Sequence, residues 1–396
     1  MNDTTDKGLL PAGLSDVLAP DAAFESSVLE RLMADFAAHG YDRVAPPLIE
    51  FEDSLLTGIG AGVAEQTFRL MDPVSQKMMG VRADMTPQVA RISARRLSKA
   101  PRPLRLSYAG QVLRVRGSQL RPERQFTQAG AELIGPDEAA ADAEVIVLAA
   151  EALANLGIAD LSIDLGLPRL VAAVCASAAE DPKSEARLRQ ALDRKDAAAV
   201  AELGDVFGEQ AAVTLAAMLN AAGPASETLE ALAALNLSGE AEAGHKLLAD
   251  VADRVRSALP ELAMTIDPVE NRGFEYHTGV TFTFFARSVR GELGNGGRYV
   301  ANGGDTVETE AATGFTLFMD TVLRALPQPP AQRRVYLPAE TPVDVAARLR
   351  ADGGITVAAL SANGDPAEEA ARLGCTHVLQ DGEILKILKT KSRNKK

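Results

Sequence analysis

The sequence has little cysteine and histidine, and it has no tryptophan. Its 396 residues include two cysteines, Cys175 and Cys375, and four histidines. Neither cysteine has a second cysteine or a histidine at metal-ligand spacing. This pattern favours two buried thiols and predicts no metal site.

Long apolar runs and a secretory leader are also missing. No apolar stretch approaches the roughly 20 residues that span a bilayer. The N-terminal residues MNDTTDKGLLPAG lack a basic segment followed by an apolar one. We therefore expect a cytoplasmic protein without a membrane partner.

The chain is also too long for one core, because single cores stop growing at about 250 to 300 residues.

Positive charge is scarce overall but is concentrated in one region. The net charge of -13 argues against a general nucleic-acid binder, because such proteins neutralise many phosphates. Ten cationic residues nevertheless stand against the single acid Glu123: Arg91, Arg95, Arg96, Lys99, Arg102, Arg105, Arg114, Arg116, Arg121 and Arg124. The cluster predicts a local anion-facing surface. Two alternatives are arginines paired with acids elsewhere in the chain and an RNA-binding module.

The first third of the chain predicts a helix followed by an extended segment. Apolar residues recur every four positions from Asp21 to His39, and Gly40 is a typical C-terminal stop. The following stretch GYDRVAPPLIE, residues 40–50, holds two prolines that favour an extended path at a strand edge. Segments of this kind often lie at interfaces.

Residues 104–135 predict an antiparallel hairpin. LRLSYAGQVLRV and QFTQAGAELIG alternate as strands do, and a polar loop joins them. On the second strand Phe126, Gln128, Gly130 and Glu132 share one face. We expect a small polar ligand to find a pocket above Gly130.

The remaining segments complete an α+β plan. Alanine-rich and leucine-rich helical patterns predict a helical insertion at about 168–259, and residues 272–318 read as strands with crowded glycines. A proline-rich linker at 327–334 ends a core of residues 1–326. Residues 335–390 then alternate strand and helix in a small α/β domain, and 391–396 form a basic tail.

Several of these segments, in this order, resemble the catalytic core of histidyl-tRNA synthetase, a class II aminoacyl-tRNA synthetase. The resemblance covers roughly residues 8–326 and implies an antiparallel sheet flanked by helices. GYDRVAPPLIE is similar to class II motif 1, which forms a dimer interface. The other matching stretches are LPAGLSDVL, VRADMTPQVAR, LRVRGSQLRPERQFTQAGAE as motif 2, RGFEYHTG with GNGGRY, and TGFTLFMDTVL as motif 3.

The resemblance implies a histidine-like ligand pocket. Asp84 and Thr86 match the residues that hold the amino group of histidine. An arginine for the carboxylate and groups for the imidazole also have counterparts. The full set of matching positions is Asp84, Thr86, Arg114, Gln128, Glu132, Arg272, Tyr276 and His277. His277 stands where the synthetase has a second tyrosine, a change that affects selectivity for the ring.

The ATP motifs depart from the family. Adenylation needs cations on the phosphates, because negative charge develops there as pyrophosphate leaves. In motif 3, however, Thr321 replaces the arginine. Arg116 replaces an acid that faces adenine, and Pro122 replaces one of two loop arginines; Arg114 and Arg124 survive. The pattern implies no adenylation, no catalytic residue and no cofactor.

A synthetase-like core with altered ATP motifs and a short C-terminal unit is similar to the regulatory subunits of ATP phosphoribosyltransferase. That resemblance implies a non-catalytic role in histidine biosynthesis. It also implies a homodimeric core that joins the short catalytic subunit in a hetero-octamer and mediates feedback by histidine. No tRNA partner is expected, because residues 333–390 are short and acidic for an anticodon-binding domain. The alternative is a divergent histidyl-tRNA synthetase or a stand-alone amino-acid-activating ligase.

Overall fold

The chain divides into two units. The computed structural model describes residues 9–118, 121–175, 182–270, 276–301, 309–327, 332–362 and 364–387. The first unit comprises Met1–Pro327 and the second Gln328–Lys396. The boundary falls one residue beyond the end predicted for the core.

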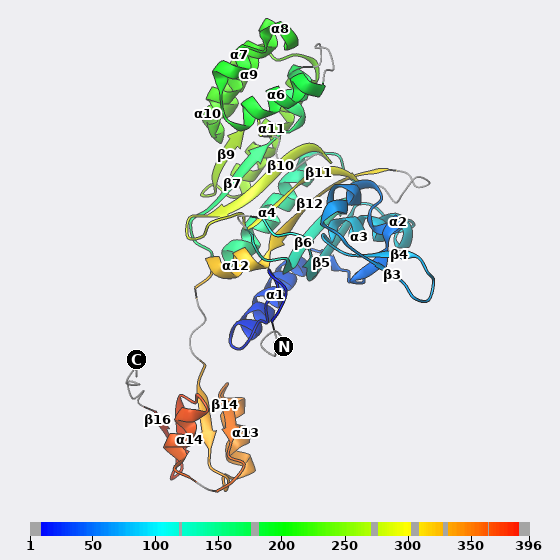
Figure 1. The fold of residues 1–396 in the computed structure, drawn as a ribbon. Coiled ribbons are helices and arrows are strands. Elements are labelled where there is room, and N and C mark those ends of the chain that lie inside the picture. The colour runs from blue at the N-terminus through cyan, green and yellow to red at the C-terminus, as the bar shows by residue number, and fades with distance from the viewer. Residues whose placement is uncertain are drawn as a thin grey trace, which may run out of the picture. The chain divides into compact units, whose positions relative to one another are not determined.

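A nine-stranded mixed sheet forms the centre of the first unit (Figure 1). Most neighbouring strands are antiparallel, while β1 and β5 pair in parallel near one edge and β7 and β9 pair in parallel near the other. The strands in spatial order are β1 (Asp42–Arg43), β5 (Leu104–Leu113), β6 (Gln125–Ile134), β12 (Glu310–Phe318), β11 (Gly294–Ala301), β10 (His277–Ala286), β7 (Leu161–Gly166), β9 (Ala263–Asp267) and β8 (Gly223–Pro224).

Long helices pack on one face of this sheet, and alternation along the strands determines which side chains they meet. The helices are α1 (Asp21–Ala38), α4 (Ala139–Leu156) and α11 (Gly239–Ala258). Ala129, Ala131 and Leu133 of β6 point into this core, and Phe36 of α1 meets Phe315 of β12 edge to face at 5.4 Å. The intervening residues of β6, including Glu132, therefore face the opposite side.

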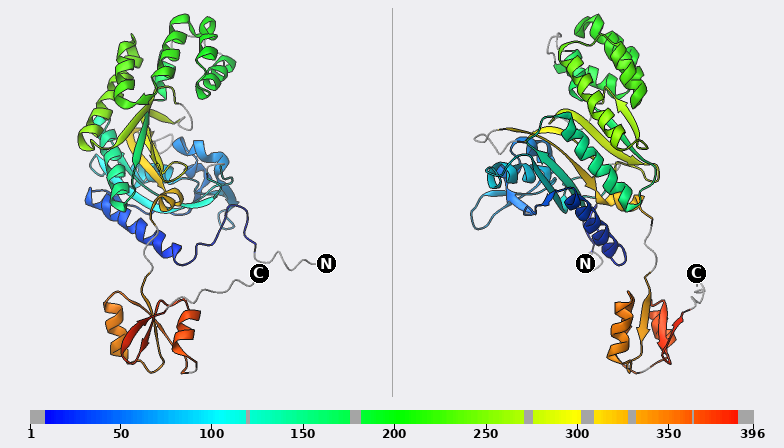
Figure 2. Two further views of the ribbon diagram at one scale, coloured as in Figure 1. Left: turned by 90° about the vertical axis from the view of Figure 1, so that its left-hand side faces the viewer. Right: turned by 180° about the vertical axis from the view of Figure 1, so that it is seen from behind.

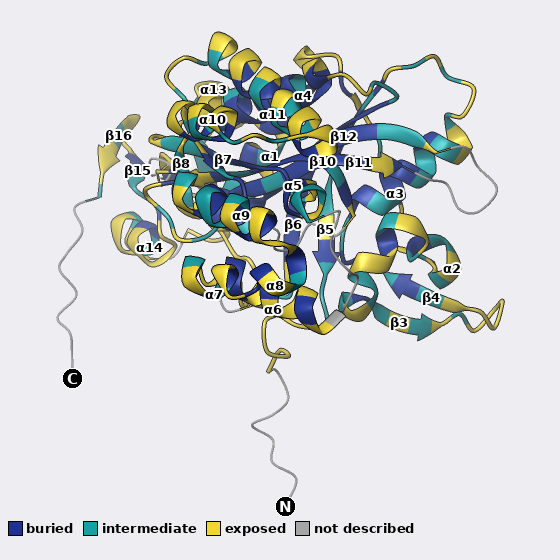
Figure 3. Cartoon of the chain, turned by 90° about the horizontal axis from the view of Figure 1, so that it is seen from above, coloured by how far each residue is buried: buried dark blue, intermediate teal, exposed yellow. Residues whose placement is uncertain are grey.

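The opposite face carries a smaller core next to a short helix. Met85 and Val89, at α3 (Thr86–Arg91), pack with Tyr108, Phe126 and Tyr299 from three strands. Figure 3 shows the central strands as buried and the surrounding helices and turns as more exposed. This second face carries Gln128 and Glu132, the polar residues predicted to share one face of the second hairpin strand.

A helical insertion follows β7. Its helices gather at one end of the sheet, beyond β7 and β9, in all three ribbon views (Figures 1 and 2). α11 returns from it to pack on α4. The shorter helices are α5 (Arg169–Val174), α6 (Pro182–Asp193), α7 (Ala197–Ala201), α8 (Gly204–Phe207), α9 (Glu209–Ala221) and α10 (Ala225–Ala234).

A three-stranded sheet lies between α1 and the hairpin in sequence. Its order is β2 (Ile49–Phe51), β4 (Met78–Val81) and β3 (Phe68–Met71), all antiparallel. The helical segments around it are α2 (Glu52–Leu55), a 3-10 helix at Gly58–Gln66 and a π-helix at Ile92–Arg96. α12 (Met319–Ala325) follows β12 and completes the strand-to-helix turn expected for TGFTLFMDTVL.

The second unit is a small α/β fold with one core on each face of its sheet. The sheet order is β14-β13-β15-β16, with the first three strands parallel. Tyr336 and Val378 lie in one core, and Val335 and Leu379 lie in the other. The elements are β13 (Arg334–Leu337), α13 (Val343–Ala351), β14 (Ile355–Ala358), α14 (Pro366–Arg372), β15 (His377–Gln380) and β16 (Glu383–Lys386).

The α+β class with helices flanking a sheet is confirmed, although parallel pairs make the sheet mixed. The tail 391–396 and part of the linker 327–334 lie outside the described residues. No helix in the described part of the chain combines the length and apolar character that crossing a bilayer requires. Within those residues, no three His, Cys, Asp or Glu side chains gather in a way that could hold a metal ion.

Candidate functional site

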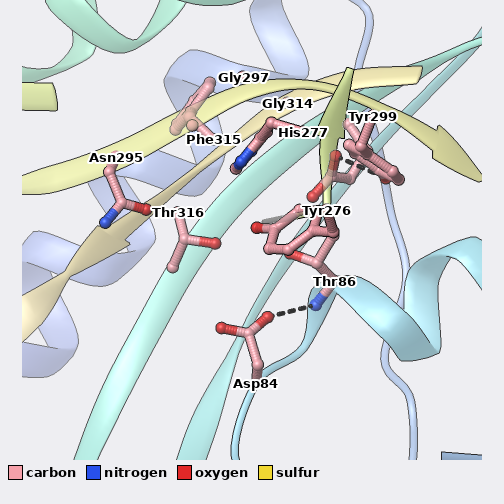
Figure 4. Close-up of a pocket in the computed structure, with 12 residues that line it drawn as sticks. Asp84, Thr86, Tyr276, His277, Asn295, Gly297, Tyr299, Gly314, Phe315 and Thr316 are labelled. Atoms are coloured by element: carbon pink, nitrogen blue, oxygen red, sulfur yellow. Dashed lines mark hydrogen bonds between the residues drawn. The ribbon is translucent and has the colours of Figure 1, made fainter. Parts of the chain in front are cut away.

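A polar pocket opens on the second face of the sheet, where β6, β12, β11 and β10 meet the loop before α3. Its cavity measures about 30 Å³, which is room for one or two water molecules. Figure 4 shows the side chains converging on it. The lining residues are Asp84, Thr86, Glu132, Tyr276, His277, Asn295, Gly296, Gly297, Tyr299, Gly314, Phe315 and Thr316.

Strand register explains why Glu132 reaches the pocket. Glu132 of β6 lies opposite Gly314 of β12, which in turn lies opposite Gly297 of β11. A Cβ at position 314 would overlap the Glu132 carboxylate. Glycine at that position therefore makes the space that the carboxylate fills.

Glu132 is a buried acid with tyrosine partners. It is 1% exposed. Tyr299 donates to its Oε2 at 3.0 Å and Tyr108 to its Oε1 at 3.3 Å. Burial raises the pKa of Glu132 to about 8, against the opposing effect of hydrogen bonds from Tyr299, Thr86 and Tyr108, and the nearby Asp84 carboxylate raises it further. Among the described residues, no Lys, Arg or His forms an ion pair with Glu132. A cationic or N–H-bearing ligand group would supply the missing partner.

Asp84 holds a second carboxylate in a fixed place. Its Oδ1 accepts from the backbone N–H of Thr86 at 2.9 Å, and its Oδ2 accepts from the Gln128 amide nitrogen at 2.9 Å. Gln128 is fully buried, and its Oε1 accepts from the Met85 backbone N–H at 3.1 Å. Gln128 therefore orients Asp84 and does not line the cavity.

Arg114 lies behind Asp84. Its Nη2 is 3.9 Å from Asp84 Oδ2, and its Nε donates to the Ala83 carbonyl at 3.2 Å. Burial is the largest influence on its guanidinium and lowers its pKa. A long contact of this kind leaves the guanidinium able to take a second anionic partner.

Two aromatic side chains close the far side of the pocket. The Tyr276 and His277 rings lie 4.1 Å apart at 31°, and Tyr276 meets Tyr299 edge to face at 6.2 Å. His277 is buried, whereas Tyr276 is 40% exposed. Tyr276 is therefore partly open to solvent, although burial of its phenol raises the pKa of that group.

The structure brings five of the eight predicted site residues to the cavity: Asp84, Thr86, Glu132, Tyr276 and His277. Gln128 and Arg114 support Asp84 from outside it. Arg272 lies outside the described residues. The expectation of a pocket above Gly130 is wrong, because the Tyr108 phenol and the Phe315 carbonyl fill that space.

The residues that sequence reasoning missed lie on β11 and β12. Asn295, Gly297 and Tyr299 share one strand face by alternation, and so do Gly314 and Thr316. The alternation that places these residues on one face is visible in GNGGRY and TGFT. It could have been used only with the knowledge that β12 lies between β6 and β11.

The expected anion-facing arginine cluster is wrong for at least four members, Arg91, Arg102, Arg105 and Arg121, because acids from distant segments pair with them. Arg91 contacts Glu50 at 2.5 Å, while Arg102 contacts Glu310 at 2.6 Å and Arg105 contacts Glu144 at 2.7 Å. Arg121 faces Asp320 at 3.0 Å, whereas Arg114 has only the 3.9 Å contact with Asp84. Composition within residues 91–128 could not show these long-range partners.

Arg121 also occupies the region between motif 2 and motif 3. Its Nε donates to Asp320 Oδ2 at 3.0 Å, and its guanidinium lies 3.8 Å over the Phe318 ring and 5.0 Å from the Phe126 ring centre. Thr321, 1% exposed, accepts from Arg324 at 3.1 Å. The Arg121 guanidinium is therefore paired with Asp320 of the same chain.

Comparison with known proteins agrees with this arrangement. A family model described as histidyl-tRNA synthetase matches residues 13–322. A relative from Paramagnetospirillum magneticum, named ATP phosphoribosyltransferase regulatory subunit, is 57% identical over 98% of this chain and 100% of its own length. One of the same name from Rhodospirillum centenum is 55% identical over 96% of each chain.

Solved structures share the fold. One from Bacillus halodurans, titled as an ATP phosphoribosyltransferase regulatory subunit/histidyl-tRNA synthetase, superposes with a TM-score of 0.77 at 24% identity, covering 92% of this chain and 96% of that one. A histidyl-tRNA synthetase from Nostoc gives 0.75 at 17% identity, covering 94% and 90%.

Proposed function

Because the chain belongs to the family of ATP phosphoribosyltransferase regulatory subunits, which have a histidyl-tRNA synthetase-like fold, we propose that it binds histidine and regulates a short catalytic subunit. The observation that carries the proposal is a pocket with two fixed carboxyl groups, Asp84 and Glu132, in a chain whose motif 3 has Thr321 in place of the arginine. Such a chain can recognise an amino acid without activating it.

The pocket suits the three polar parts of histidine. In our proposal Asp84 and Thr86 take the ammonium group, and Arg114 takes the carboxylate. Glu132 and Tyr299 take the ring nitrogens. A cavity of about 30 Å³ is smaller than this ligand. In our proposal Tyr276, the most exposed of the aromatic side chains at the pocket, moves outward when histidine binds.

Adenylation is not expected, for an electrostatic reason. A leaving pyrophosphate needs preorganised cations, and losing one such group typically costs several kcal/mol of transition-state stabilisation. Thr321 supplies no charge, and Asp320 binds Arg121 inside the protein. Asp320 would also repel phosphate oxygens if Arg121 moved away.

An apolar groove lies on the three-stranded sheet and is a candidate surface for a second copy of the chain. The groove measures about 390 Å³ and is lined in part by Pro47, Ile49, Phe51 and Met79. Leu48 is 48% exposed and Phe51 is 44% exposed. Pro47, Leu48 and Ile49 belong to the stretch similar to motif 1, and Phe51 follows it directly. We therefore propose a homodimer through this surface, as part of a hetero-oligomer in the cytoplasm.

The proposal is tested by mixing the purified chain with a short catalytic subunit and assaying phosphoribosyl transfer with and without histidine. Activation by the chain and its suppression by histidine are the expected results. Absence of activation would reject the regulatory role. Histidine-dependent exchange of labelled pyrophosphate into ATP by the chain alone would instead identify an amino-acid-activating enzyme.

A further inference from the structure

Tyr108 of β5 lies directly behind the pocket and contacts several of its walls. Its hydroxyl oxygen is 3.2 Å from Thr86 Oγ1, 3.3 Å from Glu132 Oε1 and 2.8 Å from Thr316 Oγ1. These atoms come from α3, β6 and β12. The side chain is 0% exposed and does not line the cavity. A ligand therefore meets residues that Tyr108 holds without touching Tyr108 itself.

The position of the Tyr108 ring follows from its strand partner. Tyr108 lies opposite Gly130 in the β5–β6 register. A Cβ at position 130 would overlap the phenol oxygen of Tyr108. The missing side chain at Gly130 thus lets the ring lie across β6 and deliver its hydroxyl to Glu132, two residues further along the same strand face.

The hydroxyl has one proton for its oxygen neighbours. An ionised Glu132 can only accept, so Tyr108 then donates to it and accepts from the hydroxyls of Thr86 and Thr316. A protonated Glu132 can donate to Tyr108, which then turns its own proton toward Thr316 or the Phe315 carbonyl at 3.4 Å. The direction of the hydrogen bond between Tyr108 and Thr316 is therefore coupled to the protonation state of Glu132.

We propose that Tyr108 is a positioning residue that fixes Glu132 and Thr86 relative to each other, so that both ends of the pocket act on a single ligand. The proposal rests on the function proposed above, in which Thr86 contacts the ammonium group and Glu132 the ring. Tyr108 would then contribute to ligand specificity although it does not contact the ligand.

The pKa of Glu132 provides a test that distinguishes a positioning role of Tyr108 from a merely structural one. The Asp84 carboxylate, the His277 imidazole and the Tyr108, Tyr276 and Tyr299 phenols face this region. Hydrogen bonding from Tyr108 lowers the pKa of Glu132. Removing that hydroxyl therefore makes Glu132 ionise at higher pH.

The experiment is calorimetric titration of the full chain with L-histidine between pH 6 and pH 9. Tyr108→Phe is compared with Tyr41→Phe, a matched control whose buried phenol donates to Glu144 at 2.9 Å, away from the pocket. We expect Tyr108→Phe to weaken binding about tenfold, the upper end of the typical effect of one hydrogen bond. We also expect the midpoint of its pH dependence to move upward, and Tyr41→Phe to change neither.

The outcomes separate this proposal from the proposed function. If the unmodified chain binds histidine and Glu132→Ala does not, but Tyr108→Phe matches Tyr41→Phe in affinity and midpoint, the positioning role is wrong. If the unmodified chain does not bind histidine, both proposals fail. If Tyr108→Phe does not fold, Thr316→Val removes the 2.8 Å partner of the phenol, and because Thr316 also lines the cavity this variant is judged on the midpoint alone. An upward shift of the midpoint supports the proposal, and an unchanged midpoint overturns it.

Discussion

The central residue of the site is Glu132, a carboxyl group with two tyrosine donors and without a cationic partner among the described residues. Its pKa of about 8 means that the folded protein keeps a proton that the unfolded chain has released at neutral pH. Folding then competes with ionisation of the group. Buried acids with strongly shifted pKa values are typical of binding sites, where a ligand can supply the partner that stabilises the ionised form.

This cost predicts how stability changes with pH. Below pH 4.5 the group is protonated in both states, and the penalty is absent. Between pH 4.5 and pH 8 only the unfolded chain ionises, so the contribution of Glu132 to stability falls as pH rises. Relative to Glu132→Gln, the unmodified chain should lose on the order of 3 to 5 kcal/mol of unfolding free energy across that window.

Urea unfolding of both proteins at pH 5, 6.5 and 8 measures this difference. The comparison cancels every titrating group that the two proteins share. A difference that stays constant with pH would show that Glu132 has an ordinary pKa.

Gly314 is the residue that leaves room for this carboxylate. In Gly314→Ala the added methyl group would overlap Glu132 and crowd the Ala131 carbonyl, so we expect at least a tenfold loss of histidine affinity and about 1 to 3 kcal/mol of destabilisation. Gly62→Ala is the control, because nothing lies within 4 Å of a Cβ at that position. Calorimetry and thermal unfolding that do not distinguish the two variants would refute the role of Gly314.

At the scale of elements, the segment from Pro46 to Phe51 joins the pocket to the apolar groove. Arg82 donates to the Pro46 carbonyl at 2.9 Å, and Gln88 donates to the Pro47 carbonyl at 2.7 Å. Arg82 and Gln88 flank Asp84 and Thr86 in sequence. The wall of the groove and the loop that supplies the pocket therefore share one set of hydrogen bonds.

The groove predicts a variant that separates the proposed dimer. Phe51→Glu places a charge on a surface that would be buried between two copies, so self-association should weaken at least a hundredfold, while the 44% exposed side chain leaves the fold intact. Phe285→Glu, at a phenylalanine 38% exposed on β10, is the control. Sedimentation velocity should show monomers for the first variant only; equal behaviour of both would exclude this surface.

Elements were easier to predict from the sequence than the site. The helix expected from Asp21 to His39 and the hairpin at 104–135 follow from local periodicity, and both are present with nearly the expected bounds. The pocket depends on the order of strands that are distant in sequence, so Tyr299 and Thr316 were not found. The acidic partners of the arginines could not be predicted for the same reason, since Glu310 lies 208 positions from Arg102.

At the scale of the molecule, the pocket belongs entirely to the first unit. All of its described lining residues lie between Asp84 and Thr316, and the cores of the second unit contain only residues beyond Pro327. The two units thus have separate cores, which is the condition for independent folding.

A truncation tests this independence. Residues 1–327 alone should fold and bind L-histidine within about threefold of the full chain, because no core residue of the first unit is removed. Circular dichroism and calorimetry measure both properties. A truncated chain that fails to bind histidine, when the full chain binds it, would show that the second unit contributes to the site.

The most direct test of the whole account compares the unmodified chain and Glu132→Ala in phosphoribosyl-transfer assays with the short catalytic subunit. Both proteins should activate the catalytic subunit, because Glu132 is 1% exposed and offers no docking surface. Histidine should inhibit only the complex that contains the unmodified chain. Inhibition of equal strength in both complexes would contradict the claim that this pocket is the sensor.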